Sequence, residues 1–176
     1  MKKFKLLSIL LFIFLCLAIL LVDTVRAATE GTVTATVTIG VVSVTVTPTS
    51  YDYGTVPFSS VKESFDIINI SGDKNIKATV GTLLTNLDIK GADTAGWTLS
   101  ASSIGANQYM HKFGTAGDST TRPSSYTALT TGYDNILGTS IAADSSVWFG
   151  LQINTPSSGV ATQQSAVVTV LASWAG

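Results

Sequence analysis

Cysteine and histidine are nearly absent from this chain of 176 residues, which contains one of each, Cys16 and His111. Cys16 lies in an apolar N-terminal run, so the rest of the chain has no cysteine. A disulfide framework, a cysteine nucleophile and a zinc ribbon are therefore excluded there. A secreted domain of this length does not need disulfides, because it can bury a sufficient core.

Charged side chains are also scarce, at 12% of residues, and glutamate occurs only at Glu30 and Glu63. The first 27 residues hold four of the ten basic side chains and one of the eleven acidic ones, which leaves six and ten, a net charge of −4. The basic residues are not clustered, so neither nucleic acid nor an anionic membrane surface is an expected partner. Both glutamates lie near the ends of predicted strands, where a solvated charge is the simplest interpretation.

The one long hydrophobic run, residues 6–22, follows three lysines at the N-terminus. After it, Val25-Arg26-Ala27 places small or branched residues at positions −3 and −1 of a cut after Ala27. These are the three parts of a secretory signal peptide. We therefore predict a signal peptide over residues 1–27 and a secreted protein, extracellular or at the cell surface. An uncleaved anchor is the alternative, because the run is long enough to span a bilayer.

Beyond residue 27, valine, threonine, serine and glycine dominate, and apolar residues recur with a period of two. This pattern predicts strands over residues 33–39, 42–46, 65–70, 76–80, 97–99, 108–113, 147–153 and 168–174. Residues 114–146 are less regular and predict long loops. The fold class we expect is all-β, a single antiparallel β-sandwich over 42–176 preceded by an N-terminal β-ribbon arm over 28–41.

Residues 31–47 contain two valine/threonine runs whose apolar parity changes around Gly40-Val41. A hairpin with its turn at these two residues would place both apolar rows on one face. Alternatively, Gly40 is a hinge, and residues 29–39 leave their own domain to pair with a neighbour. We favour the hinge. The predicted assembly residues of this donor strand are Val33, Ala35, Val37, Ile39 and Gly40.

Residues 46–56 resemble the opening of many immunoglobulin-like sandwich domains, in which a strand, a proline and an aromatic-Gly-x-Val turn follow one another. Residues 65–72 are similar to the next strand of such domains. Residues 147–156, followed by Gln163-Gln164 and a valine strand, resemble secreted bacterial surface proteins of this kind. The 31–47 ribbon resembles the N-terminal arm of fibre subunits that assemble by strand donation. The resemblance implies an immunoglobulin-like fold and a structural subunit of an extracellular filament, tube or coat, whose partner is a second copy. It carries over no catalytic residue.

His111 is the only candidate for histidine chemistry. It alternates with aromatic residues in 109–113, which favours a half-buried strand histidine over a catalytic or metal-binding one. Counting does not exclude a Ser–His–Asp triad, but the sequence has neither a Gly-x-Ser-x-Gly elbow nor a phosphate-binding glycine loop. We expect no enzymatic activity, and we expect His111→Ala to leave assembly or binding intact.

Oxygen ligands are all that this chain offers a metal ion, so no cofactor is expected, and calcium is the only one the residues would suit. The candidate ligands are the aspartates in or near predicted loops, Asp88, Asp93, Asp118, Asp134 and Asp144. No spacing matches an EF-hand, and a solvated turn aspartate is the simpler interpretation of each.

An alternative function is a secreted carbohydrate- or surface-binding module. Trp97, Trp148 and Trp174 would then form a face that stacks on sugar rings, although core or partial-core packing is the expectation for Trp97 and Trp174. Asn69-Ile70-Ser71 also matches the N-glycosylation sequon.

Overall fold

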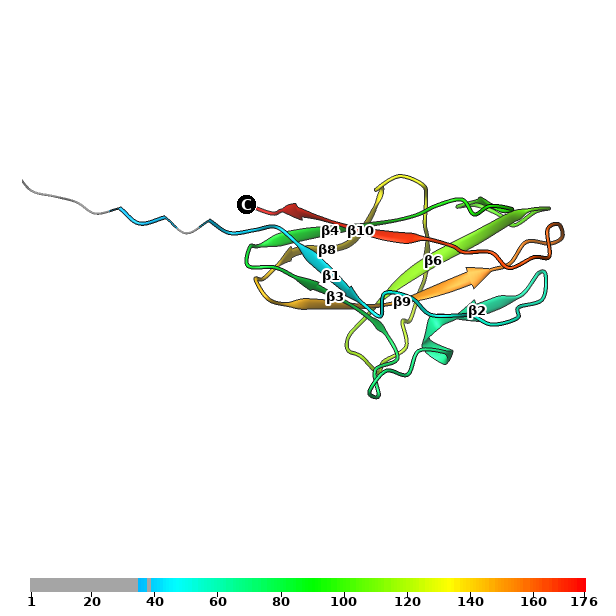
Figure 1. The fold of residues 1–176 in the computed structure, drawn as a ribbon, viewed down its shortest axis with the longest axis horizontal. Coiled ribbons are helices and arrows are strands. Elements are labelled where there is room, and N and C mark those ends of the chain that lie inside the picture. Colours follow the sequence, from blue (N-terminus) through cyan, green and yellow to red (C-terminus); the bar gives the residue numbers. More distant parts are fainter. Residues whose placement is uncertain (1–34, 38) are drawn as a thin grey trace, which may run out of the picture. The chain divides into compact units, whose positions relative to one another are not determined.

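A computed structural model describes residues 35–37 and 39–176, and the chain divides into two units, residues 1–38 and 39–176. The predicted signal peptide and most of the predicted arm, Val33 included, lie outside the described residues. The second unit is all-β, as predicted, and is built from two sheets (Figure 1). A turn of 3-10 helix, η1 (Ser64–Asp66), is the one helical element described. No helix in that part of the chain has the length and apolar character that a membrane crossing requires.

The larger sheet has seven strands in the order β1-β3-β9-β6-β5, with β2 also paired to β9 and β7 also paired to β6. These strands are β1 (Val44–Thr47), β2 (Val61–Glu63), β3 (Ile76–Val80), β5 (Thr98–Leu99), β6 (Gln108–Ala116), β7 (Thr127–Ala128) and β9 (Ser146–Asn154). β3 and β2 pair with successive parts of β9, and β6 pairs with it along most of its length. β9 is therefore the centre of this sheet.

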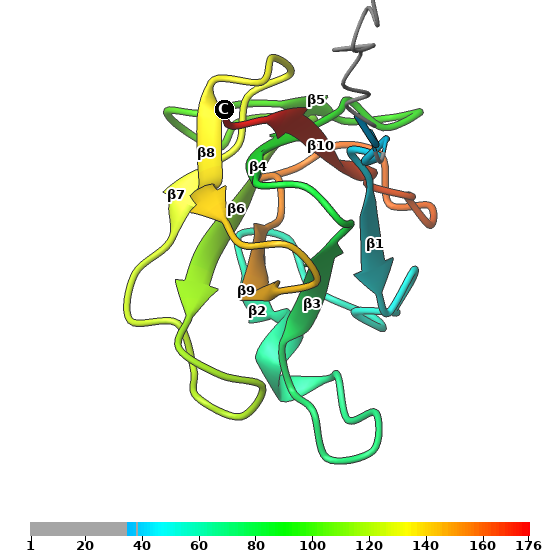
Figure 2. The same cartoon turned by 90° about the vertical axis from the view of Figure 1, so that its left-hand side faces the viewer.

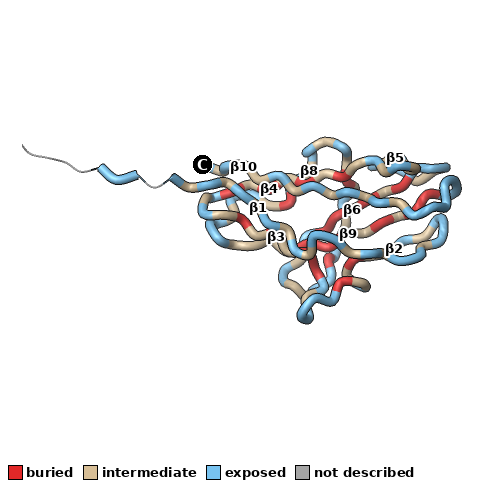
Figure 3. The backbone as a smooth tube through the Cα atoms, in the orientation of Figure 1, coloured by how far each residue is buried: buried red, intermediate tan, exposed pale blue. Residues whose placement is uncertain are grey.

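The smaller sheet contains β10 (Val168–Trp174), β4 (Thr85–Gly91) and β8 (Asn135–Ile141) in the order β10-β4-β8, all antiparallel. Alternate residues of β4 are buried, and Leu87 and Ile89 are fully covered. They pack with Leu137 of β8 and with Ala78, Phe113 and Phe149 of the larger sheet in one core. Seen end-on, the two sheets form two layers, with β1 and β10 on the same side (Figure 2). The buried backbone lies mainly in the central strands, while much of the β10 strand and the residues before it is exposed (Figure 3).

The expectation of purely antiparallel pairing is wrong, because β5 pairs with the start of β6 in parallel. The 100–107 connection turns back on itself, so that both strands run in the same direction. Thr98 N–H donates to the Asn107 carbonyl over 2.8 Å, and Ser100 N–H donates to the Tyr109 carbonyl over 2.8 Å. The larger sheet is therefore mixed.

Two other expectations need correction. The region 114–146 is not all loop, because it contains the end of β6, the short β7 and the seven-residue β8. Residues 65–70 are not a strand, because η1 and a turn closed by an Ile70–Asp73 bridge occupy that segment. The period-two pattern of residues 65–70 suggested a strand with its odd-numbered side chains on one face. In the structure the residue buried in the core is Ile68.

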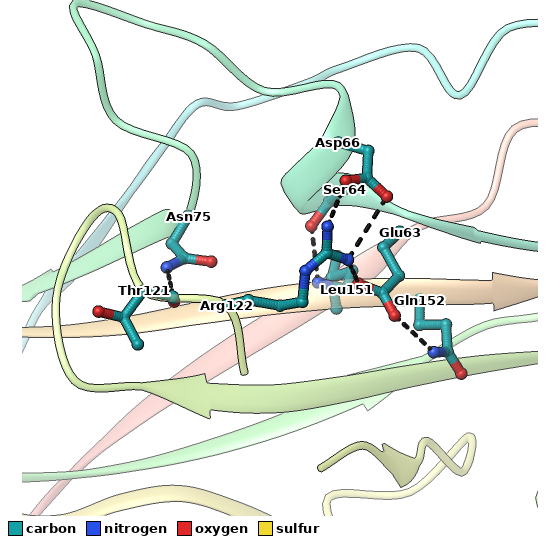
Figure 4. A network of polar contacts seen from close by, with 8 residues as sticks. All are labelled: Glu63, Ser64, Asp66, Asn75, Thr121, Arg122, Leu151 and Gln152. Atoms are coloured by element: carbon teal, nitrogen blue, oxygen red, sulfur yellow. Dashed lines mark hydrogen bonds and ion pairs between the residues drawn. The ribbon is translucent and has the colours of Figure 1, made fainter. Parts of the chain in front are cut away.

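Ser64 completes the sheet at a gap in the pairing of β9. β3 pairs with β9 as far as Phe149, and β2 resumes the pairing at Gln152. Between them, Leu151 N–H donates to Ser64 Oγ over 2.8 Å, and Ser64 is fully buried. The 3-10 turn thus supplies a side-chain acceptor where the sheet has no strand (Figure 4).

The 117–126 loop is fixed to the same region of the sheet. Arg122 forms ion pairs with Glu63 and Asp66 (Figure 4). The buried Asn75 side chain donates to the Asp118 and Thr121 carbonyls over 2.9 and 2.7 Å. Because Arg122 is exposed, its ion pairs contribute little stability, and the buried amide is the stronger tether.

Candidate functional site

A large cleft lies between the two sheets, on the side where β1 and β10 end each sheet. Its volume is about 1390 Å³. One wall is the segment 48–58 that follows β1, and the other is the segment 161–167 that precedes β10. The floor comes from the core-facing side of the larger sheet, with Ile76 of β3, His111 of β6, and Phe149, Leu151 and Ile153 of β9.

Both walls lie outside any strand, and the 48–58 wall contains bends at residues 48, 49 and 55. Within the described residues, neither 48–56 nor 161–167 makes a backbone–backbone hydrogen bond. The 161–167 wall is held instead by a side chain, because Gln164 Oε1 accepts hydrogen bonds from Gly96 N–H and Thr94 Oγ1, both over 2.8 Å. Backbone donors and acceptors are usually paired, and in the described chain those of 161–167 are not paired with the backbone of either sheet.

An aromatic row connects one wall to the floor. Tyr51 Oη donates to Tyr53 Oη over 2.9 Å, and Tyr53 Oη lies 3.2 Å from His111 Nε2. Burial raises the pKa of both tyrosines and lowers the pKa of His111 to about 4. At neutral pH the row is therefore uncharged and acts through hydrogen bonds and ring contacts.

His111 is more buried than predicted, at 2% exposed. Tyr53 is its hydrogen-bond partner, and Nδ1 has none among the residues described. No carboxylate or nucleophilic side chain of the described chain is hydrogen-bonded to this imidazole. The structure therefore places His111 in a packed wall-to-floor contact of the cleft.

Of the predicted donor residues, Val33 lies outside the described part of the chain, and the others lie within it. Ala35, Val37 and Ile39 are exposed, Val37 over 88% and Ile39 over 86% of its surface. Gly40 is partly buried, and a Cβ at this position would clash with the Leu83 side chain. The backbone at Gly40 therefore passes close to the Leu83 side chain within the second unit.

The described residues do not decide between the hairpin and the hinge, so the hinge stays a prediction. β1 takes Lys77–Val80 of β3 as its partner, antiparallel. Residues 35–37 and 39 belong to no strand. The remainder of the first predicted run lies outside the described residues.

The candidate calcium ligands are not brought together. Across residues 35–37 and 39–176, no group of three His, Cys, Asp or Glu side chains is placed to hold a metal ion. Asp118 accepts hydrogen bonds from Thr120 and Thr121 within its own turn, and Asp93 accepts from Leu99 N–H. The backbone hydrogen bond from Thr120 is the main cause that lowers the pKa of Asp118. These two aspartates serve as local acceptors.

The three tryptophans do not form one face. Trp97 lines the cleft and donates from Nε1 to the Val160 carbonyl over 2.9 Å. Trp174 lies at the opposite end of β10 and is 65% exposed, so the expectation that it packs in the core is wrong. Trp148 packs under the Lys77 ammonium, 5.4 Å from the ring centre. Asn69 is exposed, which keeps the sequon accessible.

No family model, curated protein or solved structure matches this chain. Residues 46–56 and Gln163-Gln164 belong to the segments that carry the resemblance to sandwich domains, but the sequence alone does not predict that they line one cleft. The 161–167 wall is polar from Thr162 to Ser165, and its position depends on the hydrogen bonds between Gln164 and the distant Thr94 and Gly96.

Proposed function

We propose that this protein is a structural subunit of an extracellular filament, tube or coat, with no catalytic role. In this proposal residues 42–176 are an immunoglobulin-like sandwich that lacks one strand. Residues 29–39 of the next copy fill the cleft as that strand. The observation that carries the proposal is the cleft itself, with apolar residues beneath it and two walls whose described residues 48–56 and 161–167 make no backbone–backbone hydrogen bonds.

The dimensions of the cleft favour a peptide over a small molecule. Its volume of about 1390 Å³ exceeds the roughly 300–1,000 Å³ of typical small-molecule pockets. The arm 28–39 has twelve residues, and the exposed edge formed by 161–174 has fourteen. A fully extended twelve-residue strand spans about 40 Å at roughly 3.3 Å per residue, so donor and acceptor edges are of similar length.

The energetic balance favours a long apolar donor. Val33, Val37 and Ile39 would each contribute about 1.5–3 kcal/mol if fully buried. Each new ladder hydrogen bond would add roughly 0.5–1.5 kcal/mol. The cost is about 1–2 kcal/mol of backbone entropy for each residue that becomes ordered. Threonines between the apolar positions reduce that cost, because β-branched residues are already stiff.

Removal of the arm tests the proposal. We expect a protein that begins at Gly40 to form folded or aggregation-prone subunits that make no ordered fibres by negative-stain electron microscopy. We also expect a synthetic 29–39 peptide to bind this truncated protein, and a peptide with Val33, Val37 and Ile39 changed to serine to bind far less. Ordinary polymerisation of the truncated protein would contradict strand donation, although fibres built on other contacts would remain.

The second candidate, a carbohydrate-binding module, is favoured by one observation. Tyr51, Tyr53 and Trp97 line the same cleft, and aromatic rings are the usual platforms for sugar rings. A glycan array probed with the truncated protein distinguishes the two. Saturable glycan binding that Trp97→Ala abolishes, together with no binding of the 29–39 peptide, would favour this candidate.

A further inference from the structure

We infer that the donated strand pairs with the β10 edge, antiparallel to 161–174, and that it enters the cleft at the end marked by Phe58 and Val160. This inference rests on the proposed function and specifies which edge and which polarity the donor uses. It also determines whether assembly is open or closed.

Proline distribution selects the edge. The 48–58 wall contains Pro48 and Pro57, which have no backbone N–H to donate to a new strand. The segment 161–174 contains no proline, and its part before β10 makes no backbone hydrogen bond to other described residues. β10 itself pairs only with β4 in the described chain, so its second edge continues this row. The proline-free side therefore offers the longer uninterrupted ladder.

Backbone hydrogen bonds identify the two ends of the second unit. At the first, here called the arm end, Gly81 N–H donates to the Ser43 carbonyl and Ala175 N–H donates to the Leu84 carbonyl. At the opposite end, here called the far end, Ser59 N–H donates to the Pro156 carbonyl (Figure 1). β10 runs from the far end to the arm end, where Trp174 lies.

Donor polarity follows from the end at which the arm enters. An arm that enters at the far end leaves its Ile39 there and extends its N-terminal part toward the arm end. It then runs antiparallel to β10, the pairing that forms the more stable ladder. An arm that enters at the arm end would instead run parallel to β10.

Exposed apolar residues lie at both ends, so the first arrangement would bury apolar surface of each copy. The arm end carries Ile39, Val41, Leu84 and Trp174, exposed over 86%, 62%, 41% and 65% of their surfaces. The far end carries Phe58 and Val160, exposed over 38% and 39%. Insertion from the far end brings the arm end of one copy against the far end of the next. This contact joins different surfaces, so it propagates as a filament, whereas insertion from the arm end joins like surfaces and closes a dimer.

Cysteine cross-linking tests the polarity, because the chain after residue 27 has no natural cysteine. We would compare two double variants of the 28–176 protein, T36C with Q163C and T36C with S173C, using T36C alone as the control. Thr36 and Gln163 are exposed, and Ser173 lies ten residues further along the same edge. That separation is about 33 Å at roughly 3.3 Å per residue, beyond the reach of a short bismaleimide.

We expect fibres of the T36C/Q163C variant to cross-link into a covalent ladder of dimers, trimers and higher oligomers, and those of T36C/S173C to remain uncross-linked. Dimers that cross-link only through S173C would overturn the polarity while leaving strand donation intact. Fibres in which neither pair cross-links would overturn the pairing with β10. Absence of any fibre from the unmodified 28–176 protein would contradict the proposed function itself, and with it this inference.

Discussion

At Leu151 a single hydroxyl maintains the hydrogen bonding of β9. Ser64→Ala would leave the buried Leu151 N–H without an acceptor, because neither β3 nor β2 reaches this position. We expect a loss of about 1–3 kcal/mol in the free energy of unfolding. Urea denaturation of the 40–176 protein measures it, with Ser124→Ala, at an exposed position, as the control. Equal stabilities of the two variants would show that the bond contributes nothing.

His111 makes stability dependent on pH. Its ordinary pKa of 6.5 describes the unfolded chain, and burial lowers the pKa to about 4 in the folded protein. As pH falls below 6.5, the unfolded state takes up a proton that the folded state does not, so stability declines until the pH reaches about 4. The total loss is about 3 kcal/mol, from roughly 1.36 kcal/mol for each pKa unit.

Denaturation of the 40–176 protein and of its His111→Gln variant, at pH values from 7.5 to 4, checks this. We expect the stability of the variant to fall less steeply between pH 6.5 and 4, since both proteins share the same carboxylates. Parallel pH profiles would contradict the buried neutral imidazole. We still expect fibres of the full 28–176 protein to form normally at neutral pH when His111 is replaced by alanine.

Among the elements, the 117–126 loop depends on two paired glycines. Gly114 of β6 lies opposite Gly150 of β9, and Pro123 packs over both. A Cβ at residue 114 would clash with the Ser125 carbonyl and lie 2.8 Å from Pro123 Cβ. We therefore expect Gly114→Ala to destabilise the 40–176 protein by about 1–3 kcal/mol, the usual range for overpacking.

The matched control for this loop is Gly117→Ala, because a Cβ there meets no atom within 4 Å. Thermal unfolding followed by circular dichroism compares the two. A midpoint for Gly114→Ala as high as that for Gly117→Ala would mean that the loop does not rest on the sheet.

At the level of elements, the sequence predicted those strands in which apolar residues occupy every second position without interruption. β3, β6, β9 and β10 were identified in this way. β4 was missed although Thr85, Leu87, Ile89 and Gly91 alternate inward, because a threonine and a glycine weaken the apolar row. β8 was missed because register shifts in its pairing with β4 leave Ile136 exposed and disrupt its period of two.

In the whole assembly, a donated strand would bury only every second side chain, so we expect odd- and even-numbered donor residues to differ in their effect on fibre formation. Val37→Ser should raise the critical concentration for fibre formation about 10- to 100-fold, because about 1.5–3 kcal/mol of burial is lost. Thr36→Ser should have little effect, since Thr36 would face away from the core. Light scattering of the 28–176 protein at a series of concentrations measures both. Equal effects of the two changes would contradict an inserted strand with alternating faces.

The proposed donor arm is a prediction from the sequence, whereas the cleft proposed to receive it could not be predicted from the sequence. Alternating valine and threonine predict a strand-forming segment whichever strand it pairs with. The cleft depends instead on two polar or proline-interrupted walls, which become neighbours only when both sheets are folded. Ser64 was unpredictable for the same reason, because its partner amide lies 87 residues away.

Amide hydrogen exchange of the 161–167 segment measures whether a donated strand pairs with this wall of the cleft. In the 40–176 protein these amides have no backbone acceptor among the described residues, so we expect rapid exchange. In fibres of the 28–176 protein they should become protected as the donated strand accepts their hydrogen bonds, and addition of the 29–39 peptide to the 40–176 protein should reproduce that protection. Exchange that remains equally fast in fibres and in isolated subunits would contradict the account.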